Sequence, residues 1–193
     1  MSFLGMWCLA PMDPDAIARY APELAPAIAA EASRPASMDL LEWWRSTGSV
    51  PEAMDRFIDL AGPSVLDERI CTVYEAWERG YDKSLPHLGV ATCKAYPAAG
   101  MAFALGPQRY TELPGWFGDL ILTPEQVAQT LPAVERAYDW TPQSRRQAEL
   151  RLTAALHGEG DRDDITALLD GVSPVWRAAA DAGRGLLGAH FIP

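Results

Sequence analysis

The stretch of sequence that decides the fold is residues 115–127, GWFGDLILTPEQV, in which a short extended run leads directly into a helix. Its apolar residues predict a buried strand over Phe117–Leu122. Thr123 can then cap a helix through its hydroxyl, and Pro124 has the backbone angle that suits the first helical position. Gln126 completes a capping box with Thr123, so we predict that the helix starts here.

Two further apolar runs lie at the two ends of the chain. Residues Phe3–Ala10 are apolar on both faces, which is typical of a central strand. Residues Gly185–Ile192 follow an alanine-rich helix and suit a returning strand that can pair with the first one. With Phe117–Leu122, these runs predict a single, mainly helical α+β domain over residues 1–193, whose small sheet includes both terminal strands.

Two segments are harder to interpret. The helix that starts at Asp13-Pro14 contains Pro22 and Pro26, which predict a break near Ala21. Between Leu85 and Pro114 the sequence obeys neither the helical nor the strand period. Its parts Leu88–Tyr96 and Met101–Leu105 suit either strands or buried helical turns.

The composition limits the classes of partner. The chain has 193 residues, 49% of them hydrophobic, with seven Trp and a formal net charge of -10, which indicates a globular, acidic protein. A negative field disfavours nucleic acid and anionic membrane surfaces, because both require a basic patch. The same field favours a basic protein partner.

The cysteines and histidines limit the location and the metal chemistry. Three widely spaced cysteines, Cys8, Cys71 and Cys93, suit a reducing compartment better than a disulfide framework. The sequence shows neither a signal peptide nor an apolar run of about 18 residues. Together with the cysteines, this predicts a cytoplasmic protein. The chain has no Cys-x-x-Cys or His-x-x-x-His pair, so we expect neither a metal nor a cofactor.

Three segments resemble a known family. They are LGMWCLA with DPDAI at residues 4–17, LTPEQV at 122–127 and WRAAADAG at 176–183. This layout resembles the YfbM-like family of small bacterial proteins of unknown function and covers about a quarter of the chain. Residues 40–48, LLEWWRSTG, depart from the family pattern because they lack its His. The resemblance implies an α+β architecture in a bacterial protein and implies no catalytic residues.

Two hypotheses for the function follow. The first is a non-enzymatic protein-binding module, immunity-like or adaptor-like, with an acidic surface. Trp43 would contribute to its partner-binding surface, because adjacent helical residues point about 100° apart and Trp43 and Trp44 cannot both face the core.

The alternative is a small enzyme or ligand-binding domain with a pocket between residues 85–116 and the sheet. This segment brings His, Cys, Arg and Tyr together among small residues, as a pocket wall requires. A thiol nucleophile needs a nearby base, which makes His87 and Cys93 the catalytic candidates. Cys8 and His190 on the terminal strands are a second thiol–imidazole combination. The ligand-binding candidates are Tyr96, Arg109, Tyr110 and Trp116.

Overall fold

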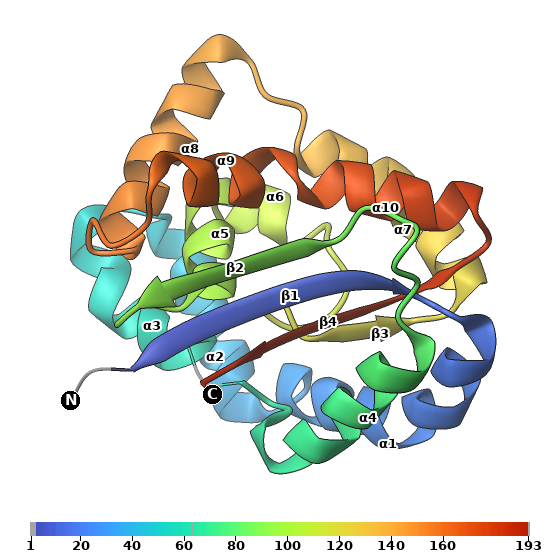
Figure 1. Ribbon diagram of the computed structural model, residues 1–193. Helices are drawn as coiled ribbons and strands as arrows, with labels where there is room; N and C mark the ends of the chain where they lie inside the picture. Colours follow the sequence, from blue (N-terminus) through green and yellow to red (C-terminus); the bar gives the residue numbers. More distant parts are fainter. Residues whose placement is uncertain (1–2, 63, 193) are drawn as a thin grey trace.

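The computed structural model describes residues 3–62 and 64–192 of the chain. Within these residues it contains a four-stranded antiparallel sheet of order β2-β1-β4-β3 (Figure 1). The strands are β1 (Leu4–Met12), β2 (Leu88–Cys93), β3 (Leu120–Leu122) and β4 (Gly185–Phe191). The central strand β1 pairs with both β2 and β4, which confirms the α+β class and the pairing of the terminal strands.

Helices cover both faces of this sheet. The α-helices of the described residues are α1 (Pro14–Ala32), α2 (Pro35–Thr47), α3 (Met54–Ala61), α4 (Ile70–Gly80), α5 (Pro97–Leu105), α6 (Pro107–Tyr110), α7 (Pro124–Ala137), α8 (Pro142–Ala155), α9 (Arg162–Asp170) and α10 (Val172–Asp181). In Figure 1, α1 and α4 lie below the sheet, whereas α7 and α10 pack together above it. The first strand begins where the last one ends, so both ends of the described chain lie at one end of the sheet (Figure 1).

The stretch at residues 115–127 forms a tight hairpin, a short strand and a helix. Trp116 and Asp119 exchange two backbone hydrogen bonds of 2.9 Å across the turn. Phe117 and Gly118 between them have φ values of 41° and 99°, so they form the turn, and the strand starts later than predicted, at Leu120. The predicted capping box of Thr123 and Gln126 is present at the start of α7.

The predicted break near Ala21 is wrong, because α1 runs unbroken from Pro14 to Ala32. Both internal prolines, Pro22 and Pro26, lie on the exposed face of the helix. There, water can hydrogen-bond to the carbonyl groups that the prolines leave free.

The ambiguous middle segment contains one strand and two helices. Residues Leu88–Cys93 form the edge strand β2, and Pro97–Leu105 form α5, whose nine residues are all buried. A helix that is buried on every side has no polar face, so its sequence shows no helical period. Most of the segment is therefore core.

Candidate functional site

A cavity of about 540 Å³ lies between α4 and the strands β1 and β2. We call it the aromatic cavity. On this face of the sheet α1 packs over β3 and β4, and α4 packs on the end of β4, whereas the outward face of β2 stays open and leaves the space that forms the cavity. Its volume is in the range of small-molecule sites, which is about 300–1,000 Å³.

The wall of the aromatic cavity comes from α4 and the residue that follows it. Tyr74 and Trp77 of α4 and Tyr81, directly after its last residue, line the cavity at i, i+3 and i+7, so their rings follow one another along it. Phe191 of β4 supports the wall, because its ring packs edge-on against Tyr74 and Trp77 with centroids 5.5 and 6.0 Å apart. The ring of His87 contacts Tyr81 at 5.2 Å and extends the wall.

Backbone hydrogen bonds hold α4 over the sheet. The amide of Asp13 donates to the carbonyl of Gly80 at 2.7 Å, and the amide of Asp82 donates to the carbonyl of Pro11 at 3.1 Å. Gly80 also permits the close approach of α4 to α1, since a Cβ there would lie 2.3 Å from the Cβ of Ala16. The aromatic residues of the wall are thus held at a fixed position over the sheet.

Small side chains form the floor of the aromatic cavity. Cys8 and Ala10 of β1 and Gly89 of β2 line it, and a Cβ added to Gly89 would meet only the sulfur of Cys8, at 3.9 Å. Burial raises the pKa of the Cys8 thiol to about 11. The thiol is therefore protonated at neutral pH and contributes apolar surface rather than a nucleophile.

One polar group in the wall has no partner. The indole nitrogen of Trp77 is buried and makes no hydrogen bond within residues 3–62 and 64–192. A buried N–H without an acceptor costs about 1–3 kcal/mol. The nitrogen is enclosed by protein atoms, so this cost belongs to the fold and a molecule in the cavity does not reach it.

A second constellation surrounds the carboxylate of Asp119, which is fully buried. Its Oδ2 atom accepts hydrogen bonds of 2.9 Å from the Ser64 hydroxyl and from the Val65 amide. Its Oδ1 atom accepts the His190 amide at 3.0 Å and lies 3.4 Å from Nδ1 of the same residue. We call these residues the Asp119 hub; it joins the hairpin turn, the loop before α4 and β4.

The imidazole of His190 is part of this hub. Its Nε2 atom lies 2.7 Å from the carbonyl oxygen of Gly62, whereas Nδ1 approaches Asp119 at 3.4 Å without forming a hydrogen bond among the described residues. Burial by itself lowers the pKa of His190, but the charge of Asp119, its contact with the ring, the Gly62 carbonyl and the charge of Asp67 outweigh burial and raise it. This arrangement favours a charged imidazolium.

The Asp119 hub has the residue types of a catalytic triad but not the connectivity. The Ser64 hydroxyl donates to Asp119 and not to His190, and the Nε2 atom that would serve as a base is bound to Gly62. The adjacent cavity has a volume of only about 120 Å³. We assign the hub a structural role.

The predicted thiol–imidazole combinations are not brought together. Cys93 is exposed at the end of β2, while His87 precedes that strand. At about 3.3 Å per residue, six residues of extended chain separate them by about 20 Å. Cys8 and His190 occupy neighbouring positions of the β1–β4 ladder, opposite Ala189 and Trp7, so their side chains point to opposite faces.

Two of the predicted ligand-binding residues stabilise the fold. The ring of Tyr96 is half-buried and contacts Phe3 and His190, with centroids 5.1 and 6.4 Å away. The guanidinium of Arg109 donates to the carbonyls of Ala137 and Asp139 at 2.7 and 2.9 Å, at the end of α7 and just after it.

The other two, Tyr110 and Trp116, lie in the core with 7% and 4% exposure. The hydroxyl of Tyr110 accepts the Phe117 amide at 2.6 Å, and its ring stacks on Phe117 at 4.5 Å. Burial is the main cause that raises the pKa of Tyr110. Neither residue is available to a ligand.

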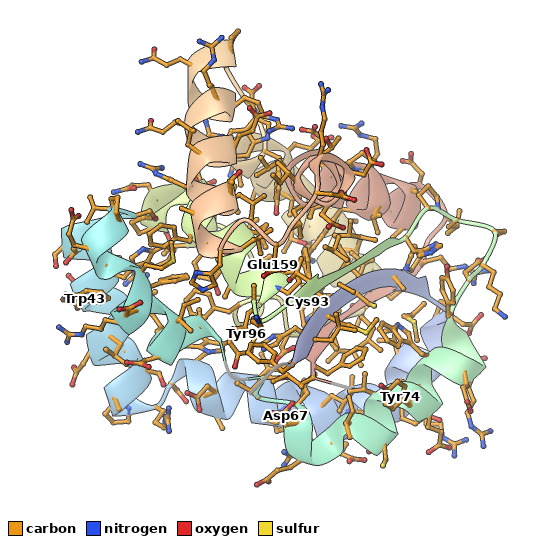
Figure 2. All side chains as sticks on the ribbon, turned by 60° about the vertical axis from the view of Figure 1, so that its left-hand side comes forward. Trp43, Asp67, Tyr74, Cys93, Tyr96 and Glu159 are labelled. Carbon is orange, nitrogen blue, oxygen red and sulfur yellow. The ribbon has the colours of Figure 1, made fainter. Side chains whose placement is uncertain are left out.

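Trp43 and Trp44 differ in burial, as the helical geometry predicts. Trp44 is fully buried, whereas Trp43 is half-buried and its ring is covered by the guanidinium of Arg56 at 4.3 Å. Figure 2 shows Trp43 far from Tyr74, on the other side of this view. Trp43 is therefore not part of the aromatic cavity.

Of the predicted site residues, His87 and Cys8 line the aromatic cavity, although their predicted partners, Cys93 and His190, do not. The aromatic residues of the wall were not predicted, although the sequence contains a pattern that marks them: Tyr74, Trp77 and Tyr81 repeat at helical spacing. That spacing is equally typical of a helix face that packs into the core. Only the uncovered strand β2 shows that these residues border a cavity instead.

Residues 3–62 and 64–192 contain no group of three or more His, Cys, Asp and Glu side chains placed to hold a metal ion. In the same part of the chain, no helix combines the length and apolarity needed to cross a bilayer. Comparison with protein-family models, curated proteins and solved structures finds no match to this chain.

Proposed function

We propose that the protein binds a small ligand with a planar aromatic ring in the aromatic cavity. The observation that carries the proposal is a preformed cavity whose wall presents three aromatic rings above a floor of small side chains. Aromatic walls with few polar groups are typical of small-molecule sites, because planar ligands stack on the rings while the polar groups orient them.

A cavity-filling substitution tests this proposal. Gly89→Val adds a branched side chain to the floor, where the structure leaves room for it, and valine suits a strand. We expect fluorescence enhancement of the neutral dye N-phenyl-1-naphthylamine with the wild-type protein and its loss in the variant. Ala91→Val is the matched control, because Ala91 is exposed on the same strand and face but does not line the cavity.

The cysteines supply an independent readout. At a pH of about 9, where a small fraction of the Cys8 thiol is ionised, a bound ligand should slow its alkylation by N-ethylmaleimide, because Cys8 lines the floor. Alkylation of the exposed Cys71 and Cys93 should not change. Equal dye binding by wild type and Gly89→Val, with no protection of Cys8, would show that the cavity is not a binding site.

A protein-binding role is the second proposal, favoured by the open face of β2. Gly89, Ala91 and Cys93 alternate with buried residues and are exposed along an edge strand. The acidic composition then favours a basic partner. Capture of such a partner should weaken as salt rises, whereas a salt-insensitive interaction would count against it.

A further inference from the structure

The charged side chains around the aromatic cavity indicate the class of its ligand. Glu78 of α4 and Lys83 of the following loop both line it. Both are exposed, and neither has an ion-pair partner in the described parts of the chain. By contrast, Glu75 and Arg79, which do not line the cavity, pair with each other at 3.0 Å. The rim of the cavity therefore presents one negative and one positive group without partners.

The charges in the segments around the cavity are divided in the same way, with positive groups on the Lys83 side and a negative group on the Glu78 side. Residues 83–111, which include the loop before β2 and β2 itself, contain no Asp or Glu, although the chain carries a net charge of -10. Lys83 and His87, both at the cavity, and Lys94, just after β2, lie in this acid-free segment. On the α4 side, Glu78 is the carboxylate that borders the cavity. One side of the cavity thus favours an anion and the other a cation.

The interior adds a further requirement. The rings of Tyr74, Trp77 and Tyr81 favour an aromatic ring, by stacking and edge-to-face contact.

From these observations we infer that the ligand is an aromatic zwitterion, a planar ring that bears both an ammonium group and a carboxylate, as in a free aromatic amino acid. The ammonium would pair with Glu78, the carboxylate with Lys83, and the ring would occupy the space above Cys8 and Gly89. This inference rests on the proposed function, because it specifies the ligand of the same cavity.

Four compounds with one ring system separate the contributions of the charges. Isothermal titration calorimetry with L-tryptophan, tryptamine, indole-3-propionate and indole compares a zwitterion, a cation, an anion and a neutral molecule. We expect L-tryptophan to bind most tightly and indole most weakly. Because an exposed ion pair contributes up to about 1 kcal/mol, each charge should change the affinity by up to about fivefold.

Charge-removing variants assign each contribution to its residue. Lys83→Gln should weaken L-tryptophan and indole-3-propionate but not tryptamine, and Glu78→Gln should weaken L-tryptophan and tryptamine but not indole-3-propionate. The matched controls are Lys94→Gln and Glu75→Gln, which remove the same charges outside the cavity lining. These controls should bind all four compounds as the wild type does.

The possible outcomes distinguish the proposal that the cavity binds an aromatic ligand from the inference that this ligand is a zwitterion. If the four compounds bind equally well, or if the two cavity variants behave like their controls, the zwitterion inference is overturned while aromatic binding in the cavity stands. If none of the four binds and the dye is not bound either, both proposals are overturned. The predicted order of affinities, with its loss in the two variants, supports both.

Discussion

Replacement of Asp119 should be among the most damaging single changes in this protein. Asp119→Ala removes the acceptor of two backbone amides, those of Val65 and His190, and of the Ser64 hydroxyl. An unsatisfied buried donor costs about 1–3 kcal/mol, and the His190 imidazolium would lose its counter-charge. We therefore expect the free energy of unfolding to fall by about 3–5 kcal/mol, against a typical total of about 5–15 kcal/mol.

The loss should depend on pH in a defined direction. The pKa of His190 is raised above its ordinary value of 6.5 by the net effect of its acceptors. The stabilisation by the charged pair is thus fully present below pH 6.5 and is lost as the pH rises through the raised pKa. The difference between wild type and Asp119→Asn, which keeps the shape but not the charge, should accordingly be larger in mild acid than in mild alkali.

Urea unfolding of the wild type, Asp119→Ala and Asp119→Asn at about pH 5.5 and about pH 8.5 measures both the loss of stability and its pH dependence. The titration of the His190 ring protons by nuclear magnetic resonance should shift to lower pH in Asp119→Asn, with the exposed His87 and His157 as internal controls. Asp67→Asn is the matched control, because Asp67 is an exposed acid near the same ring, and it should cost less than about 0.5 kcal/mol. A loss below about 1 kcal/mol for Asp119→Ala, or a difference that grows with pH, would refute the reasoning.

Three further substitutions are tested by urea unfolding, two around the hairpin turn and one, Tyr138→Phe, as a comparison elsewhere in the core. Tyr110→Phe should lower the free energy of unfolding by about 1–3 kcal/mol, because it leaves the Phe117 amide without its acceptor. Tyr138→Phe should cost less than about 1 kcal/mol, since that hydroxyl contacts only the weak acceptor sulfur of Met101, and equal losses would contradict this reading. Gly118→Ala should cost at least about 2 kcal/mol, because its φ is 99° and its new Cβ would lie 2.5 Å from that of Ala98; a neutral effect would show that the turn can adjust.

The local elements of this fold follow from local chemistry. The Thr123–Gln126 capping box predicts the start of α7, because the side chains that satisfy the first helical amides are three residues apart in the chain. The apolar terminal strands are likewise identifiable, since a strand buried on both faces needs apolar residues throughout. The adjacency of Trp43 and Trp44 was enough to predict that only one of them is fully buried.

Only the tertiary structure decides where the functional surface lies. The stripe of Tyr74, Trp77 and Tyr81 has the spacing of a core-facing helix, and it borders a cavity because the helices on that face leave β2 uncovered. The Asp119 hub joins residues that are 54, 55 and 71 positions apart, so no local pattern marks it. Helix caps and strand faces depend on interactions over a few residues, whereas a cavity and a buried charge depend on which surfaces the packed elements leave open or enclose.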